Sequence, residues 1–430
     1  MKEPASLGAW LAYLETLHPK AIALGLERVR AVYERLTVAP VCPVITVTGT
    51  NGKGSTCALL ERMLSAGGYT VGLYSSPHLL RYNERVRVAG VEATDSELCA
   101  AFAAVEAVRH DTPLTYFEFG TLAALWLFAR AQTDALVLEV GLGGRLDAVN
   151  VIDADVAVVT TIAIDHTDYL GFTRDDIGRE KAGIFRPGRV AVCADPHPPS
   201  ALVDHARAIG APLLKIGSDF GFVAEDRQWR YFGPGGTRHS LPYPALHGAY
   251  QLANAAAALT ALDALRLRLP VAMGAVREAL VSVELPGRFQ VLPGRPVTVF
   301  DVAHNEQAAR VLADTVAAMG FHPRTLAVFG IMADKDIDAV IATMRPRVDH
   351  WLVATLPSPR GATATLLRRH LTNAGVSPEA IVDFDEPGAA YRSAREMATE
   401  ADRIIVFGSF LTVAAALAEE PRRGSASSFP

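Results

Sequence analysis

The sequence predicts an α/β protein of two domains, and three observations support this prediction. Short β-branched apolar segments alternate with segments whose apolar residues recur at helical spacing, a pattern typical of parallel sheets covered by helices. The stretch from Val44 to Leu64 joins such a strand to such a helix through a glycine-rich turn. The chain has 430 residues, more than one hydrophobic core usually organises, so we expect two domains.

The composition is typical of a well-packed soluble enzyme. The formal net charge of −5 is spread without long runs of one sign, so no nucleic-acid surface is expected. The most apolar predicted helix, Leu122 to Ala131, is too short to span a bilayer, and the amino-terminal residues lack the apolar core of a signal peptide. The four cysteines are too far apart to form a metal or redox pair: Cys42, Cys57, Cys99 and Cys193. We therefore expect a protein of the reducing cytoplasm, with no membrane partner.

A glycine-rich turn after strand Val44–Thr48 predicts a phosphate site. Glycine lets the backbone wrap closely around an anion, and the dipole of the following helix adds partial positive charge. Lys53 can reach the outer phosphates of a nucleotide, and Ser55 or Thr56 can contact Mg²⁺. The pattern departs from the common phosphate loop, because Gly54 follows the lysine where Ser or Thr is usual. The alternative is a glycine-rich turn that binds nothing.

Polar residues lie at or just after the carboxyl ends of three further predicted strands. The carboxyl ends of strands are the place where α/β sheets bind ligands. The strands are Thr70–Tyr74, Ala135–Val140 and Asp155–Thr161. Ser76 follows the first, in a segment that is alternatively an ordinary Ser-Pro turn. Glu139 lies near the end of the second, and a buried carboxylate there needs a partner, either Mg²⁺ or Arg145. His166 follows the third and is a metal ligand, a base or a buried hydrogen-bonded residue.

Other segments allow both a structural and a functional interpretation. Residues 7–38 are predicted to form helices that pack through one apolar face, which includes Leu7, Trp10 and Leu14. The aromatic residues within 114–120 lead into a long helix, and taken alone they favour a core position over stacking on a flat heterocycle. Lys181 lies near a helix start predicted at Ile177, and a lone lysine is usually a solvated charge. Asn254 lies in an alanine-rich helix predicted to begin at His247.

The second domain is predicted to begin near Leu285, because Pro286 and Gly287 interrupt the preceding helix. Without further information, Arg288 in this segment is interpreted as a surface residue of a linker. Helices and strands then alternate, which predicts a parallel sheet with mostly right-handed crossovers. The predicted strands are Thr298–Asp301, Thr325–Phe329, His350–Ala354 and Arg403–Phe407.

These motifs resemble those of the Mur ligase superfamily, in the form found in folylpolyglutamate synthases and dihydrofolate synthases. The matching blocks are T-G-T-N-G-K-G-S at 48–55, S-S-P-H-L at 75–79, T-Y-F-E at 115–118, E-V-G-L-G-G-R-L-D-A at 139–148, G-R-E-K-A-G-I at 178–184, L-P-G-R-F at 285–289 and D-V-A-H-N at 301–305. The resemblance covers nearly the whole chain. It implies a P-loop-type Mur-ligase ATPase domain that also binds pterin (residues 1–286) and a smaller Rossmann-like α/β glutamate-ligase domain (residues 287–430).

The resemblance also implies roles for individual residues. The implied ATP ligands are Thr50, Asn51, Gly52, Lys53, Gly54, Ser55, Asn254, Arg288 and Asp301. The implied metal ligands are Ser76, Glu139 and His166, and Lys181 is implied to react with CO₂ to a carbamate, which requires a lowered lysine pKa. The implied catalytic residues are Lys53, Glu139, His166 and Lys181. The implied pterin or folate contacts are Thr16, Leu17, His18, Pro19, Thr115, Tyr116, Phe117, Glu118, Leu146, Asp147 and Ala148.

The resemblance implies a bifunctional ligase. Such an enzyme joins L-glutamate to 7,8-dihydropteroate and to the γ-carboxylate of tetrahydrofolates, with ATP as co-substrate. It would use Mg²⁺ at two sites, with K⁺ a candidate further cation, and act as a monomer. ATP would convert a carboxylate to an acyl phosphate, which the amine of glutamate attacks, and closure of the two domains would exclude water. The alternatives are a folylpolyglutamate synthase with the second activity alone, a Mur ligase acting on a UDP-sugar, and a nucleotide-binding regulator without ligase activity.

Overall fold

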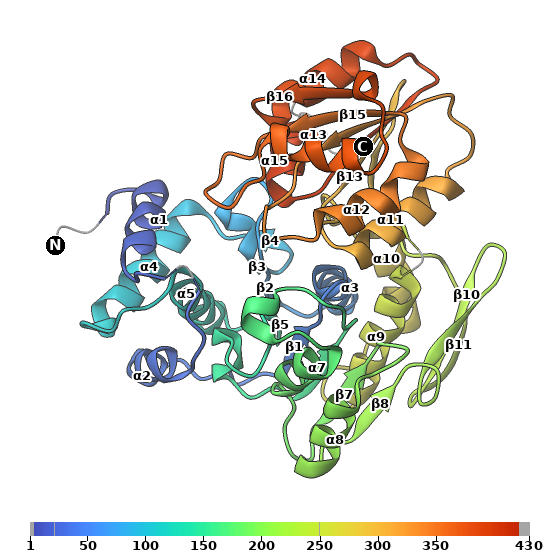
Figure 1. The fold of residues 1–430 in the computed structure, drawn as a ribbon. Helices are drawn as coiled ribbons and strands as arrows, with labels where there is room; N and C mark the ends of the chain where they lie inside the picture. Colours follow the sequence, from blue (N-terminus) through green and yellow to red (C-terminus); the bar gives the residue numbers. More distant parts are fainter. Residues whose placement is uncertain (1–3, 21, 249, 421–430) are drawn as a thin grey trace, which may run out of the picture. The chain divides into compact units, whose positions relative to one another are not determined.

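The computed structural model describes residues 4–20, 22–248 and 250–420. The chain divides into two compact units. Unit 1 comprises Met1–Ala245 and Tyr250–Glu284, and unit 2 comprises Leu246–Ala249 and Leu285–Pro430. Each unit has its own large sheet and its own helices (Figure 1).

Unit 1 alternates strands and helices along most of its length. Its helices are α1 (Leu7–Thr16), α2 (Glu27–Leu36), α3 (Lys53–Ala66), α4 (Asp95–Arg109), α5 (Tyr116–Arg130), α6 (Thr167–Leu170), α7 (Arg174–Ala182), α8 (Ser200–Ile209), α9 (Gln251–Ala264) and α10 (Met273–Ser282), with 3-10 turns η1 (Tyr82–Arg85) and η2 (Ala148–Val151). Its strands are β1 (Val44–Thr48), β2 (Val71–Tyr74), β3 (Val86–Val88), β4 (Val91–Glu92), β5 (Ala135–Glu139), β6 (Val156–Val159), β7 (Val190–Cys193), β8 (Leu213–Lys215), β9 (Gly221–Ala224), β10 (Trp229–Gly233) and β11 (Gly236–Leu241).

The main sheet of unit 1 has eight strands in the order β4-β3-β2-β5-β1-β6-β7-β8. The strands from β2 to β8 in this order are parallel, and β3 and β4 form an antiparallel edge. Every residue of β1 and β5 is buried, as expected for central strands that helices cover on both faces. The carboxyl ends of β2, β5, β1 and β6 therefore adjoin along one edge of the sheet, the edge at which such sheets bind ligands.

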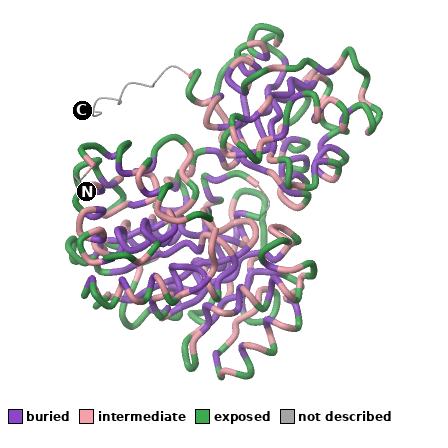
Figure 2. The backbone as a smooth tube through the Cα atoms, turned by 60° about the vertical axis from the view of Figure 1, so that its left-hand side comes forward, coloured by how far each residue is buried: buried purple, intermediate pink, exposed green. Residues whose placement is uncertain are grey.

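Two apolar clusters pack several of the helices of unit 1 on the sheet. One packs α1, α2, α4 and α5 together around Trp10, Phe102 and Phe119, and the other packs α7 and α8 around Ile177 and Leu202. Figure 2 shows that the buried backbone lies inside the unit and the exposed segments at its periphery. The predicted apolar face at the amino terminus is confirmed, because Leu7, Trp10 and Leu14 are buried.

A small antiparallel sheet of order β11-β10-β9 packs on α9 through one buried carboxylate. Asp263 of α9 accepts hydrogen bonds from the Tyr231 hydroxyl (2.7 Å) and from the N–H of Gly235 (3.1 Å), and it forms an ion pair with Arg238. A carboxylate this deeply buried is stable only with such partners. The sheet and α9 are therefore fixed to each other, and α9 carries Asn254.

Unit 2 is built on a six-stranded sheet of order β12-β13-β17-β14-β15-β16, parallel except for β12. Its strands are β12 (Gln290–Leu292), β13 (Val297–Asp301), β14 (Thr325–Phe329), β15 (His350–Ala354), β16 (Ile381–Phe384) and β17 (Arg403–Phe407). Its helices are α11 (Glu306–Ala318), α12 (Ile337–Met344), α13 (Ala364–Asn373), α14 (Pro387–Met397) and α15 (Phe410–Ala418), with 3-10 turns η3 (Arg345–Arg347) and η4 (Pro378–Ala380). The four predicted strands are confirmed, and β12 and β16 are additions to the prediction.

Two helices begin at residues other than those predicted. α7 begins at Arg174 rather than at Ile177, because Thr173 and Asp176 form a capping box that starts the helix earlier. Lys181 consequently lies in the last turn of α7 and not near its start. α9 begins at Gln251 rather than at His247. Among the described residues, no helix combines the length and apolarity needed to cross a membrane.

Candidate active site

The predicted phosphate loop joins β1 to α3 at the carboxyl edge of the sheet of unit 1 (Figure 1). Residues that follow β6 brace this loop. The N–H of Thr50 donates to the carbonyl of Thr161 (2.6 Å), and the hydroxyl of Thr160 donates to the carbonyl of Asn51 (2.7 Å). The hydroxyl of Thr50 donates to the carbonyl of Ala163 (3.1 Å). These hydrogen bonds hold the loop in one conformation. The loop therefore loses less conformational entropy when a ligand binds.

Two glycines of the loop are required by close contacts. Gly52 has φ +90°, and a Cβ at this residue would lie 2.6 Å from Oδ1 of Asn254. Gly49 has φ +153°, and a Cβ there would lie 1.7 Å from Oγ1 of Thr160. Glycine is therefore the residue that fits both positions. Gly52 is also the N-cap of α3, so the loop leads directly into a helix amino terminus, which attracts anions.

Lys53 is the first residue of α3 and lies over the loop. Its ammonium donates hydrogen bonds to the carbonyls of Gly49 (3.0 Å) and Thr50 (3.2 Å). The positive charge of Lys53 and the partial positive charge at the amino end of α3 thus both lie at the phosphate loop. This arrangement favours a polyphosphate ligand.

Ser76 and Glu139 lie together at the ends of β2 and β5. The N–H of Ser76 donates to Oε2 of Glu139 (3.2 Å), and Glu139 is 3% exposed. Arg145, the alternative partner suggested by the sequence, forms its ion pair with Glu180 (2.7 Å). A serine and a buried carboxylate thus lie next to each other, with Glu139 one strand and Ser76 two strands away from the phosphate loop.

His166 follows β6 and caps the short helix α6 with a left-handed backbone, φ +52°. This conformation costs a residue other than glycine about 1–2 kcal/mol, and such strain occurs often at functional sites. The loop that leads to His166 is fixed by Arg174, which donates to the carbonyl of Ile162 (3.0 Å) and pairs with Asp195 (2.9 Å). The imidazole Nε2 lies 4.0 Å from Oδ1 of Asp165. His166 is 34% exposed at its side chain, so its ring can reach a ligand.

Lys181 is buried, with 3% of its surface exposed. Burial lowers the pKa of Lys181 to about 7, because a low-dielectric environment disfavours the charged ammonium. The positive charge of Lys53 lowers this pKa further, while Asp165 and Asp147 oppose the shift. The interpretation of Lys181 as a solvated charge is therefore wrong. A large fraction of this amine is neutral at physiological pH, as a lysine that reacts with CO₂ must be.

The oxygen donors at this edge of the sheet fit a hard divalent cation such as Mg²⁺. Within residues 4–20, 22–248 and 250–420, no three His, Cys, Asp or Glu side chains are grouped so that they could hold a metal ion. Magnesium is usually held by one or two carboxylates together with substrate phosphates and water. Glu139 beside Ser76, with the phosphate loop on the neighbouring strand, fits that pattern.

Two segments with expected pterin contacts, 115–118 and 146–148, each make a close contact with a neighbouring loop of unit 1. The ring of Phe117 packs against Gly141, where a Cβ would lie 2.7 Å from its Cζ. The N–H of Gly25 donates to the carbonyl of Leu146 (3.2 Å), which joins the loop after α1 to the segment 146–148. Asp147 is buried and accepts hydrogen bonds from backbone N–H groups, yet burial raises its pKa to about 7. A carboxyl group of this pKa can be protonated or ionised at neutral pH.

The expected pterin residues differ in exposure. Thr115 and Glu118 are buried and form the capping box of α5, whereas Tyr116 and Phe117 are partly exposed. Both carboxylate oxygens of Glu118 are engaged with protein groups. The four residues from Thr16 to Pro19 end α1 and begin the loop to α2, and the Thr16 hydroxyl donates to the carbonyl of Tyr13 (2.7 Å).

Arg288 and Asp301 lie together in unit 2. The carboxylate of Asp301 accepts hydrogen bonds from the N–H groups of Phe289 (2.8 Å) and Ala303 (2.7 Å). Burial raises the pKa of Asp301, and the charge of Arg288 opposes this shift. The guanidinium of Arg288 also stacks over the ring of Phe410, 4.9 Å from its centroid. Arg288 is therefore fixed by packing, unlike an ordinary linker residue.

Two residues that shape the site escaped the sequence interpretation. Gln251 is buried at the start of α9, where its Nε2 donates to the hydroxyl of Ser55 (3.3 Å) and its Oε1 accepts from Asn254 (3.0 Å). Glu84 accepts three backbone N–H bonds of 2.6–2.7 Å from the segment 79–81, which follows Ser76. The start of the predicted alanine-rich helix was the available signal for Gln251.

A cavity of about 700 Å³ lies elsewhere in unit 1. Its lining includes Pro43 and Leu136, at the amino ends of β1 and β5, and therefore lies at the opposite edge of the sheet from the phosphate loop. It is not part of the candidate active site.

Comparison with known proteins assigns the chain to a family. The family model described as "Mur ligase middle domain" matches residues 47–262, and the one described as "Mur ligase, glutamate ligase domain" matches residues 287–410. A relative from Escherichia coli (strain K12), described as "Dihydrofolate synthase/folylpolyglutamate synthase", is 50% identical over 409 residues, which cover 95% of this chain and 94% of the relative.

Two solved structures share the fold over nearly the whole chain. "E.coli FolC in complex with DHPP and ADP" has a TM-score of 0.92 at 48% identity and covers 97% of this chain and 98% of its own. A bifunctional folylpolyglutamate synthase/dihydrofolate synthase "with Mn, AMPPNP and L-Glutamate bound" has a TM-score of 0.90 at 46% identity, with coverage of 97% and 98%. The predicted resemblance and fold class are confirmed. The chain belongs to the dihydrofolate synthase/folylpolyglutamate synthase family of the Mur ligases.

Proposed function

We propose that this chain joins L-glutamate to 7,8-dihydropteroate and to the γ-carboxylate of tetrahydrofolates, in a reaction driven by ATP. The observation that carries the proposal is the edge of the sheet in unit 1. Four adjoining strand ends there bear the phosphate loop with Lys53, the pair Ser76 and Glu139, and the loop of His166. The relatives bound to ADP, DHPP, AMPPNP, Mn and L-glutamate support the same substrates and a divalent cation for this chain.

The reaction needs positive charge around phosphate, because a carboxylate is a poor acyl donor until it is phosphorylated. Lys53 and the amides of the loop bind the β- and γ-phosphates of ATP and stabilise the charge of the transferring group. The acceptor carboxylate becomes an acyl phosphate, and the amine of glutamate then displaces phosphate. Thr50, Asn51, Gly54 and Ser55 complete the nucleotide contacts of the loop.

We assign one divalent cation to Ser76 and Glu139, and a second to His166 together with the carbamate proposed for Lys181. When bound, Mg²⁺ neutralises phosphate charge and orients the phosphates for transfer. The second Mg²⁺ site and a role for K⁺ belong to the proposal and are tested by metal and monovalent-salt titration.

Lys181 is proposed to carry a carbamate beside the cation site. The neutral amine adds to CO₂ and loses one proton, which leaves an anionic carbamate in place of an uncharged amine. Its lowered pKa and its burial support this chemistry. The anion would supply an oxygen ligand near the loop of His166.

The remaining assignments concern the acceptor and the nucleotide. We propose that the segments 16–19, 115–118 and 146–148 bind the pterin, and that Phe117 and Asp147 contact it directly. Asn254, Arg288 and Asp301 are proposed nucleotide ligands, and Gln251 holds Asn254 and Ser55 in place. We further propose two functional domains, with the boundary in the sequence between residues 286 and 287. We also propose that the enzyme is a monomer and that it is located in the cytoplasm.

An isotope experiment tests the acyl-phosphate route. Dihydropteroate labelled with ¹⁸O in its carboxylate is converted in the presence of ATP, Mg²⁺ and L-glutamate, and the released phosphate is analysed by mass spectrometry. Transfer of one ¹⁸O atom per turnover is expected. Unlabelled phosphate, formed together with product, would exclude an acyl phosphate.

A further inference from the structure

The loop between α1 and α2 is tied to the proposed pterin subsite by one arginine of α2. Nη2 of Arg28 donates to the carbonyl of Ala23 in the loop (2.7 Å) and to Oε1 of Glu118 (2.9 Å). Its Nε donates to Oε2 of Glu118 (3.4 Å). The side chain of Arg28 is 25% exposed and that of Glu118 is 4% exposed. One guanidinium thus holds the loop on one side and the first turn of α5 on the other.

Glu118 transmits the position of Arg28 to the aromatic residues of α5. Its Oε2 also accepts the N–H of Thr115 (2.7 Å), and this bond closes the capping box that starts the helix. Tyr116 and Phe117 lie between these two residues in the first turn of α5. The orientation of that turn therefore depends on the carboxylate that Arg28 holds.

A second bond joins the same loop to the other side of the proposed subsite. The N–H of Gly25 donates to the carbonyl of Leu146 (3.2 Å), next to Asp147. The loop consequently spans from the segment 115–118 to the segment 146–148. Among the hydrogen bonds of the described residues, loss of the Arg28 contacts would leave only the bond from Gly25 to Leu146 between the loop and the two segments.

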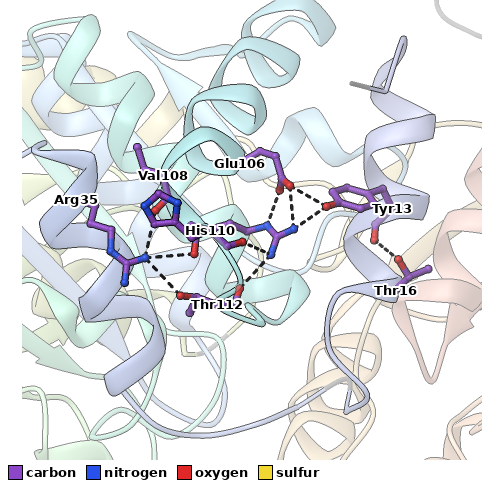
Figure 3. Close-up of polar contacts among 8 residues, drawn as sticks. Tyr13, Thr16, Arg35, Glu106, Val108, His110 and Thr112 are labelled. Carbon is purple, nitrogen blue, oxygen red and sulfur yellow. Dashed lines mark hydrogen bonds and ion pairs between the residues drawn. The ribbon is translucent and has the colours of Figure 1, made fainter. Parts of the chain in front are cut away.

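The two helices that flank the loop have anchors of their own on α4 (Figure 3). Tyr13 of α1 donates to Oε1 of Glu106 (2.9 Å) and accepts from Arg109 (2.7 Å). Arg35 of α2 donates to the carbonyls of Val108 (3.3 Å) and Arg109 (3.2 Å). These contacts do not involve Arg28. A substitution at Arg28 therefore releases the loop while α1 and α2 stay attached.

We propose that Arg28 is a positioning residue of the dihydropteroate subsite. It holds the loop segment 22–26 and the first turn of α5 in the arrangement that binds the pterin, and so sets the affinity for this acceptor. This inference rests on the function proposed above. The bonds of Arg28 are charge-assisted at Glu118, so their loss is expected to weaken acceptor binding about tenfold. The hydrogen-bond partners of Arg28, Ala23 and Glu118, are not among the proposed nucleotide ligands, so the affinity for ATP is expected to stay within about twofold of the wild-type value.

The test compares Arg28→Ala with Arg35→Ala. Arg35 lies in the same helix, and like Arg28 it donates hydrogen bonds to backbone carbonyls. Steady-state phosphate release gives KM for dihydropteroate, KM for ATP and kcat, and thermal denaturation reports folding. For Arg28→Ala we expect a KM for dihydropteroate about tenfold higher, with the other two constants nearly unchanged. Arg35→Ala is expected to retain the wild-type KM for dihydropteroate. Arg28→Lys keeps the charge beside Glu118 and is expected to recover part of the lost affinity.

Two results would overturn the inference. One is an unchanged KM for dihydropteroate in folded Arg28→Ala. The other is an equal rise in the constants for ATP and dihydropteroate, or the same rise in Arg35→Ala, which would indicate general destabilisation. A wild-type enzyme that does not turn over dihydropteroate would instead refute the proposed function, so the two failures are distinguishable.

Discussion

Replacement of Gly52 by alanine tests whether the shape of the phosphate loop determines nucleotide binding. Gly52 has φ +90° and ψ −6°, and it lies immediately before Lys53 at the start of α3. An alanine Cβ would lie 2.6 Å from Oδ1 of Asn254, well inside van der Waals contact. Asn254 is 3% exposed and bonded to Gln251, so its side chain has little room to move away.

The size of the effect follows from two contributions. A left-handed backbone costs alanine about 1–2 kcal/mol relative to glycine, which should appear as lost stability. The contact with Asn254 adds a displacement of the loop by a few tenths of an ångström, because neither the helix nor Asn254 can yield alone. We expect ATP affinity to fall by about tenfold or more, equivalent to about 1.4 kcal/mol.

Gly68 provides the matched control. It has φ +89° and is exposed in the turn after α3, and a Cβ there would meet nothing within 4 Å. Gly68→Ala therefore carries the same backbone strain without the contact and away from the loop. Thermal denaturation should report a stability loss for Gly52→Ala at least as large as that for Gly68→Ala, and calorimetric titration with an ATP analogue should report weaker binding for Gly52→Ala alone. Wild-type nucleotide affinity in Gly52→Ala, or equal weakening in Gly68→Ala, would refute the reasoning.

Three further predictions concern ionisable groups. The extent of carbamate on Lys181 should rise as pH rises through about 7, because its pKa is lowered and the neutral amine is the reactive form; labelling with ¹³C-bicarbonate and NMR measures it, and a signal that persists in Lys181→Arg would contradict the assignment. Glu139→Gln should raise the Mg²⁺ concentration needed for half-maximal phosphate release by about tenfold or more, and an unchanged requirement would exclude Glu139 as a ligand. In unit 2, hydrogen bonding from Arg324 lowers the pKa of Asp402 to about 2. Because this folded-state pKa lies below the unfolded value of about 3.9, the stabilisation is present above that value and is lost as pH falls toward 2; Asp402→Asn should flatten this part of the stability profile measured by thermal denaturation, and an unaltered profile would show that the pair contributes nothing.

The parts of the fold that the sequence predicts best are those with strong local patterns. β1 with its glycine turn and α3, and the four central strands of unit 2, follow from apolar runs that are buried on both faces. β4 has only two residues, and β16 has exposed residues at two of its four positions, so neither carries an apolar period that marks a strand. Their existence depends on a neighbouring strand rather than on their own sequence.

The site shows the same division. The sequence predicts the phosphate loop around Lys53 from the spacing of its glycines. It predicts Glu139 because this residue is a single charge within an apolar strand. The roles of Gln251 and Arg28 depend on contacts with Ser55 and Glu118, which lie far away in sequence, and no local pattern encodes such pairs. Likewise, the burial that lowers the pKa of Lys181 arises from packing in the folded unit and not from the sequence around the lysine.

The most direct test of the proposed function is phosphate release by the wild-type protein with ATP, Mg²⁺ and L-glutamate, with dihydropteroate and tetrahydrofolate compared as acceptors. The proposal predicts release that depends on L-glutamate with both acceptors. Release with tetrahydrofolate alone would contradict the bifunctional assignment and leave a folylpolyglutamate synthase. Release with neither acceptor would contradict the proposed function altogether.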